Sequence, residues 1–215
     1  MKNIYIKYLN NELKLETWQK IGVICLVIVI TGIFGWLYEF IFYYFNSGMK
    51  EFYWRGANFL PWINIYATGS IMIMILTKKY KKKPLLVFLI AFISTGILEY
   101  FTGLTMYKLM NGIRCWDYNT EILNFGNIGG FVCLRSVTFF GLSALLLIYG
   151  IVPICIYVST IIKKEVFLAF SITICAIFLF DELYNLLFAK TLNLPRSADI
   201  YKKIGIKYMD YYKNK

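Results

Sequence analysis

Histidine is absent from this chain of 215 residues, and charged residues make up only 16% of it. Without histidine, the chain lacks the commonest metal ligand and the commonest general base near neutral pH. The five cysteines form no CxxC pair. Most of them lie in apolar runs, where cysteine behaves as a small hydrophobic residue, so neither a disulfide framework nor a zinc site is predicted. No metal or other cofactor is expected.

Sequence motifs for nucleotide hydrolysis and nucleophilic catalysis are also missing. There is no GxxxxGK[ST] phosphate-binding loop, so the chain is not expected to hydrolyse ATP by that route. A nucleophile elbow is lacking too. A soluble domain usually carries roughly 25% charged residues, well above the share found here. The sequence therefore gives no support to a soluble enzyme.

Long apolar runs dominate the sequence instead, and 59% of its residues are hydrophobic. A helix needs about 20 apolar residues to cross the bilayer core, and about five segments qualify. They run approximately over Ile21–Phe45, Leu60–Thr77, Pro84–Met110, Gly130–Ile151 and Val166–Phe188. The predicted fold is all-α, a polytopic transmembrane helical bundle of about five helices with a structured loop between helices 3 and 4.

The predicted organisation has three parts. Residues 1–20 form a polar N-terminal segment, residues 21–189 the transmembrane bundle, and residues 190–215 a basic C-terminal tail. The N-terminal segment is too polar for the apolar region of a signal peptide. Residues 154–162 follow Pro153 and leave two alternatives open. They either extend the fourth helix past a proline kink or lie in the membrane interface.

The formal net charge is +11, which in a soluble protein would suggest nucleic acid. Here the lysines lie in loops and tails between apolar runs, so the predicted partner is the lipid bilayer with its anionic headgroups, and no nucleic acid. The positive-inside rule favours a cytoplasmic position for the face that carries the N-terminus, although the basic tail favours the opposite face. The lysines on the N-terminal face are Lys14, Lys20, the lysines of 78–83, Lys163 and Lys164. The predicted location is the cell membrane, as a multi-pass protein.

Ionisable residues inside the apolar runs are candidates for function, because each costs about 2.5–3.5 kcal/mol at the centre of a membrane helix. If all five segments cross the membrane, successive helices alternate in direction, and all of these residues fall in the half of the membrane opposite the N-terminus. They are Glu39, Glu99, Arg135, Asp181 and Glu182. Two loops on the same side add Arg55, Arg114, Trp116, Asp117 and Tyr118. The sequence thus predicts a polar pocket that opens toward that side.

Two interpretations of these charges remain open. They can line a substrate pocket, or they can be structural ion pairs and side chains that extend to the headgroups. If Arg135 lies inside the bundle rather than at the headgroups, it is expected to pair with at least one of Glu39, Glu99 and Asp181, because arginine stays protonated and can hold a carboxylate through two hydrogen bonds.

Several motifs in a fixed order carry a family resemblance. They are Gly35-Trp36-Leu37-Tyr38-Glu39, Arg55-Gly56, Leu98-Glu99-Tyr100, Arg114 with Trp116-Asp117-Tyr118, and Cys133-Leu134-Arg135. Over about Gly35–Pro153 the chain resembles the CmpB-like bacterial membrane proteins, an ABC-transporter type IV permease family. The resemblance implies a transmembrane permease component that takes its ATP hydrolysis from a separate subunit.

The leading hypothesis is therefore the transmembrane component of a small-molecule, ABC-type transporter, and no catalytic residue is assigned. Its expected substrate-binding residues are Glu39, Arg55, Glu99, Arg114, Trp116, Asp117, Tyr118, Arg135 and Asp181. One alternative is a membrane-embedded enzyme acting on a lipid or lipid-linked substrate, with paired carboxylates as acid and base. Another is a non-catalytic membrane partner or sensor. A homo-oligomer is an open option.

Overall fold

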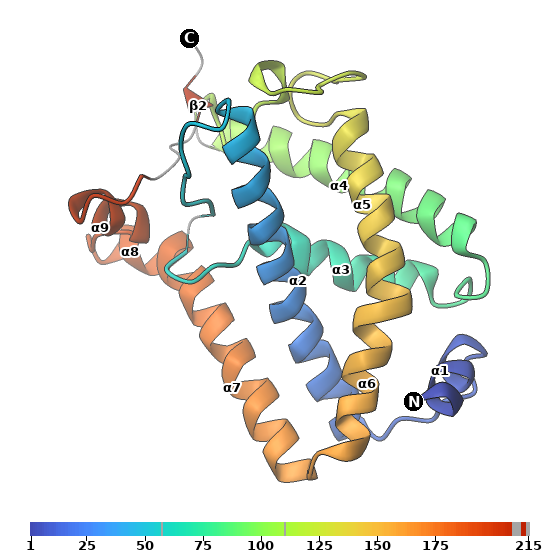
Figure 1. Ribbon diagram of the computed structural model, residues 1–215. Helices are drawn as coiled ribbons and strands as arrows, with labels where there is room; N and C mark the ends of the chain where they lie inside the picture. The colour runs from blue at the N-terminus through green and yellow to red at the C-terminus, as the bar shows by residue number, and fades with distance from the viewer. Residues whose placement is uncertain (57, 110, 208–211, 214–215) are drawn as a thin grey trace. The chain divides into compact units, whose positions relative to one another are not determined.

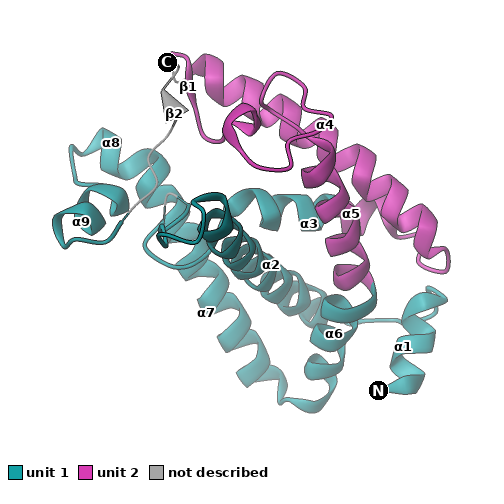
Figure 2. Cartoon of the chain, turned by 45° about the horizontal axis from the view of Figure 1, so that its top comes forward, with its two compact units in different colours: residues 1–72, 149–209 teal, residues 73–148, 210–215 magenta. Residues whose placement is uncertain are grey.

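The computed structural model describes residues 1–56, 58–109, 111–207 and 212–213, and most of them are helical (Figure 1). The chain divides into two compact units, which Figure 2 shows in different colours. Unit 1 contains residues 1–72 and 149–209, and unit 2 contains residues 73–148 and 210–215.

Four helical runs are long and apolar enough to cross a membrane, which confirms the predicted all-α membrane bundle. They are Thr17–Asn46, Pro84–Leu109, Leu134–Ile161 and Lys164–Thr191. Of the five predicted crossings, the second, Leu60–Thr77, is wrong in length. The helix α3 covers only Asn64–Thr77, which is 14 residues. At 1.5 Å per residue it spans about 21 Å, whereas the hydrocarbon core is about 30 Å thick.

The long runs are built from several labelled elements. They are α2 (Thr17–Asn46), α4 (Pro84–Leu109), α5 (Leu134–Leu146), η2 (Leu147–Ile151), α6 (Val152–Ile161), α7 (Lys164–Leu183), η3 (Tyr184–Phe188) and α8 (Ala189–Thr191). The smaller elements are α1 (Lys2–Leu9), η1 (Tyr118–Thr120), α9 (Ser197–Lys203), and the antiparallel strands β1 (Ile113–Arg114) and β2 (Tyr212–Lys213).

Local signals explain where these runs begin and how they continue. The first starts at Thr17, because the Glu16 side chain accepts from the first turn of the helix and Gln19 accepts from the Glu16 amide at 3.1 Å. The second run starts at Pro84, as predicted, and its expected end at Met110 lies outside the described residues. The third run continues past Pro153 to Ile161, with the π-helical turn η2 just before the proline. The widened turn accommodates the proline ring, so residues 154–161 extend the helix.

In unit 1, α2 and α7 pack in parallel and lie side by side in Figures 1 and 2. A methyl group added at Gly22 would overlap Phe167, and one added at Gly32 would lie 2.8 Å from the Phe178 ring. The contacts thus advance in the same direction along both helices. The run that contains α6 is antiparallel to α2, since Gln19 donates to Ser159 at 3.2 Å.

Unit 2 is built on the antiparallel pair α4 and α5. A methyl group added at Gly96 would lie 2.9 Å from Val137, and one at Gly141 would lie 2.6 Å from Phe88. Small residues let membrane helices approach this closely. The pairing brings the end of α4 and the start of α5 together, beneath the long loop that joins them.

The segment between α2 and α3 turns back into the middle of unit 1. The Ile63 amide donates to the Gly32 carbonyl at 3.1 Å, and the Trp62 ring packs 5.1 Å from that of Phe178. Gly32 lies halfway along Thr17–Asn46, and Phe178 halfway along Lys164–Thr191. We call residues 47–63 the re-entrant segment. Because its last residues are not helical, α3 begins at mid-span.

Helix α3 then crosses α2 near its middle. In this crossing Thr31 donates to Ser70 at 3.1 Å, and Gly35 faces the Tyr66 ring. A methyl group at Gly35 would overlap this ring, so the crossing depends on the absence of a side chain there.

This close approach gives a test of the crossing. Gly35→Ala is expected to lower the thermal unfolding midpoint in detergent, because overpacking costs about 1–3 kcal/mol. In a helix without this contact, replacing glycine by alanine would stabilise the helix by about 0.8–1 kcal/mol. The direction in which the unfolding midpoint moves therefore shows whether the Tyr66 contact is present. The control is Ile33→Ala, at an exposed neighbouring position, where little change is expected. An increase in the midpoint for Gly35→Ala would contradict the packing of Tyr66 described here.

Candidate functional site

Asp181 near the end of α7 is the centre of the polar network in unit 1, and it is only 5% exposed. Its carboxylate accepts from the amides of Phe59 and Leu60 at 2.9 Å each, and from the Trp62 indole at 3.0 Å. The side-chain nitrogen of Asn185 donates a fourth hydrogen bond to this carboxylate at 3.0 Å. Asp181 thereby satisfies two backbone N–H groups of the re-entrant segment, which would be costly to leave unpaired inside a membrane.

The helix α9 packs against the same segment from the C-terminal side. The Asn185 side-chain oxygen accepts from the Ser197 amide at 2.9 Å, and the Tyr201 hydroxyl donates to the Phe59 carbonyl. Burial and the Asp181 carboxylate raise the pKa of Tyr201 above its ordinary value, which keeps the hydroxyl protonated as a donor. The re-entrant segment is thus held by side chains from α7 and α9.

Glu39 and Arg55, both predicted site residues, form one ion pair. The Arg55 Nε lies 2.9 Å from a Glu39 oxygen, and the Tyr66 hydroxyl donates to the other oxygen at 3.2 Å. The guanidinium also lies 4.0 Å from the centroid of the Tyr43 ring. Arg55 is 7% exposed, so this pair fastens the re-entrant segment to α2 through a largely buried contact.

Glu182 and Asn58 have hydrogen-bonding capacity left over. The Asn58 amide nitrogen donates to a Glu182 oxygen at 2.6 Å and to the Trp62 carbonyl at 3.2 Å. Asn58 is 2% exposed, and its side-chain oxygen accepts no hydrogen bond from any described residue. Within the described part of the chain, Glu182 forms no ion pair. Both groups are acceptors, but the Asn58 oxygen is buried, so Glu182, which is partly exposed, is the one of the two that a ligand could reach.

In unit 2, Glu99 fastens the loop of residues 111–133 to the helices. It is 4% exposed and accepts from the Tyr118 hydroxyl and, at 2.8 Å, from the Ser136 hydroxyl. Tyr118 comes from the loop and Ser136 from the first turn of α5, so a single carboxylate of α4 connects all three parts.

Of the three acids predicted to pair with Arg135, Glu99 interacts with it electrostatically, but the arginine's ion pair is with a different acid. The ion pair of Arg135 is with Glu121 of the loop, at 2.6 Å, and its other terminal nitrogen donates to the Ile122 carbonyl at 3.1 Å. Glu121 lies in a polar loop outside every apolar run, so a search confined to the apolar runs did not consider it.

The remaining predicted residues stabilise the loop internally. Arg114 donates to the Gly129 carbonyl at 2.7 Å, lies 3.8 Å from Asp117 and lies 4.4 Å from the Phe131 ring. The Trp116 indole donates to the Phe131 carbonyl at 2.9 Å, and Asp117 caps η1 through the Asn119 amide at 3.0 Å. These contacts give the loop a defined structure, as the sequence predicted.

Sequence reasoning overlooked uncharged partners and one loop acid. They are Asn58, Trp62, Tyr66, Glu121, Ser136, Asn185 and Tyr201. Polar residues within or beside the apolar runs are the signal that could have identified several of them. Among the residues that the structure describes, no three histidine, cysteine or carboxylate side chains are placed to hold a metal ion.

A family model described as "Putative ABC-transporter type IV" matches residues 26–186, which include all four long helices at least in part. No curated protein and no solved structure matches the chain.

The Arg135–Glu121 pair can be tested by a double-mutant cycle. Arg135→Met is expected to destabilise the protein by about 3–5 kcal/mol, because it leaves a buried carboxylate without its partner. The Glu121 side chain is only 1% exposed. Adding Glu121→Gln should recover part of the loss, as read by thermal unfolding in detergent. The matched control adds Glu51→Gln, an acid paired with Lys207 in unit 1, and should be additive. Additivity in both cycles would contradict the pair.

Proposed function

The chain belongs to the ABC-transporter type IV family, and on that premise we propose that it is the membrane-spanning permease subunit of a small-molecule transporter. ATP hydrolysis would come from a separate subunit. The observation that supports this most is the re-entrant segment, whose non-helical end reaches the middle of both Thr17–Asn46 and Lys164–Thr191. We further propose that the protein resides in the cell membrane with its N-terminal face in the cytoplasm.

Non-helical backbone at membrane depth supports a transport role for a physical reason. In lipid, every backbone polar group must be satisfied, so irregular backbone persists there only where protein buries it or where it lines a water-filled cavity. Many transporters place their substrate site at such a break, near the middle of the membrane. Asp181 provides the compensation here, through the amides of Phe59 and Leu60.

Polar side chains at the same level favour access to water. Asn64 and Thr68 on the first turns of α3 are exposed and hydrogen-bond each other at 3.0 Å. Asn64 follows Ile63, which is bonded to mid-span Gly32. Exposed polar groups at this depth are unfavourable against lipid and are expected beside a hydrated path.

The chemistry of the leftover acceptors suggests the kind of substrate. Asp181 has four donors and Glu39 has Arg55, so Glu182 and the Asn58 side-chain oxygen are the groups of this network with capacity to spare. They favour a substrate with N–H donors or a positive charge. We assign Glu182 to substrate contact, with the buried Asn58 side chain donating to it, and Glu39, Arg55 and Asp181 to holding the re-entrant segment. In unit 2, Glu99, Arg114, Trp116, Asp117, Tyr118 and Arg135 would position the loop of residues 111–133.

Thiol labelling tests the hydrated path. In a variant whose native cysteines are replaced, Asn64→Cys is expected to react with a membrane-impermeant thiol reagent from one side of the membrane. Ile33→Cys is the matched control, because it lies next to Gly32 at the same level and is 40% exposed. We expect it to face lipid and to stay unreactive, since the reagent and the thiolate both need water. Equal reactivity at the two positions, or none at Asn64→Cys, would contradict a path beside α3.

Transport itself can be tested in membrane vesicles of the source cell, with their solutes profiled by mass spectrometry. We expect ATP to change the content of at least one small solute, and only when the chain is present. The purified chain alone should not hydrolyse ATP. Glu182→Gln preserves the acceptor for Asn58 but removes the charge. It should weaken apparent substrate affinity about tenfold, the value of one hydrogen bond to a charged group.

Glu51→Gln is the control for that substitution, because Glu51 is a more exposed acid of the same unit. Vesicles whose solutes do not respond to ATP would contradict the transport role. Transport that is equally affected by both substitutions would contradict the assignment of Glu182 alone.

A further inference from the structure

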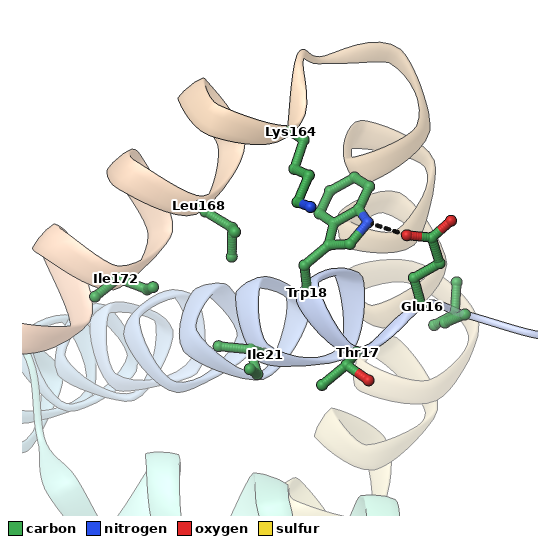
Figure 3. Close-up of a pocket in the computed structure, with 8 residues that line it drawn as sticks. Glu16, Thr17, Trp18, Ile21, Lys164, Leu168 and Ile172 are labelled. Atoms are coloured by element: carbon green, nitrogen blue, oxygen red, sulfur yellow. Dashed lines mark hydrogen bonds between the residues drawn. The ribbon is translucent and has the colours of Figure 1, made fainter.

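A groove lies between the first turns of α2 and α7 in unit 1, at the opposite end from Asp181 (Figure 3). Its volume is about 650 Å³. The main lining residues are Glu16, Trp18 and Ile21 on one side and Lys164, Leu168 and Ile172 on the other. The proposed function does not use this groove.

Close helix packing shapes the groove. Gly22 lets Phe167 and Ser171 of α7 approach α2, and the Trp18 and Phe167 rings meet edge to face with centroids 5.9 Å apart. Beside this contact the helices leave an open channel rather than an enclosed core. Its lining residues Ile21 and Ile172 are 46% and 47% exposed.

The groove changes from polar to apolar along the helices. Its charged rim is Glu16, just before Thr17 begins α2, and Lys164, the first residue of α7. Its floor is Ile21, Leu168 and Ile172, one to two turns farther into the spans. Leu168 and Ile172 share one face of α7 at helical spacing. A phospholipid has the same order, from headgroup at the interface to acyl chain in the core.

The rim also carries one charge of each sign. Lys164 is exposed and forms no ion pair with any described residue. The Glu16 carboxylate accepts from the Trp18 indole at 2.5 Å and caps α2, and it has lone pairs left for a further donor. Figure 3 shows the two charged side chains on either side of the Trp18 ring. A tryptophan at this level is typical of the headgroup layer.

We propose that this groove is a binding site for a zwitterionic phospholipid of the phosphatidylethanolamine type. Its phosphate contacts the Lys164 ammonium, its own ammonium contacts the Glu16 carboxylate, and one acyl chain lies over Ile21, Leu168 and Ile172. The paired charges favour this lipid over an anionic one, because an anionic headgroup would meet Lys164 with attraction but Glu16 with repulsion.

Native mass spectrometry of the full chain tests the site, with phosphatidylethanolamine and phosphatidylglycerol supplied in equal amounts. The wild-type chain is expected to retain more phosphatidylethanolamine. Lys164→Gln should reduce its retention about fivefold, the value of one lysine contact to a lipid headgroup. Lys163→Gln is the matched control, because Lys163 precedes the helix and does not line the groove. It should leave retention unchanged.

Glu16→Gln tests whether the negative charge selects between the two lipids. Glutamine can still cap the helix, but it removes that charge. It should shift retention toward phosphatidylglycerol. Leu168→Trp, which fills the apolar floor, should reduce retention of both lipids. Equal retention of the two lipids by the wild-type chain would overturn the proposal. The same effect from Lys163→Gln as from Lys164→Gln would also overturn it, because the groove would then hold only bulk lipid.

Discussion

A buried carboxylate that satisfies backbone amides is the constraint on which the arrangement of unit 1 depends. The re-entrant segment has no regular hydrogen-bond ladder at its mid-span end, so its N–H groups need acceptors from elsewhere. Asp181 accepts from two of these amides and from the Trp62 indole. Trp62 is thereby held against Phe178 in the core between α2 and α7. Without this carboxylate, the backbone N–H groups of the non-helical residues before α3 would be left unpaired at that depth.

Unit 2 uses charge in a related way. Glu99 on α4 accepts from a tyrosine of the loop, and Arg135 on α5 binds a loop carboxylate and a loop carbonyl. In both units, charged residues of the helices thus hold connecting segments to the bundle, in largely buried contacts. This structural use accounts for most of the ionisable groups within the helices. It also makes Glu182 and Asn58 distinctive, because their acceptor capacity exceeds what the fold consumes.

The differences between prediction and structure have specific causes. Hydropathy predicts that the apolar run Leu60–Thr77 crosses the membrane, because it depends on the side chains alone and carries no information on whether the backbone is helical. In the structure, Leu60 and Trp62 contact Asp181, and the helix starts only at Asn64. Arg135 was predicted to pair with an acid of a helix because an isolated carboxylate inside an apolar run is costly. The loop instead folds back and buries Glu121 beside Arg135.

The sequence by itself determined the membrane class, the four long helices, the family and the residues whose charges require compensation. These follow from the length and hydropathy of local segments and from ordered motifs, which need no knowledge of distant contacts. Only the tertiary structure decided which partner each charge finds, where the re-entrant segment ends, and that a groove with charges of both signs opens between α2 and α7. Some of those features join residues more than a hundred positions apart, such as Leu60 and Asp181, whereas Glu39 and Arg55 are only 16 positions apart. Their pairing is set by packing at small residues such as Gly22 and Gly32, which local patterns do not encode.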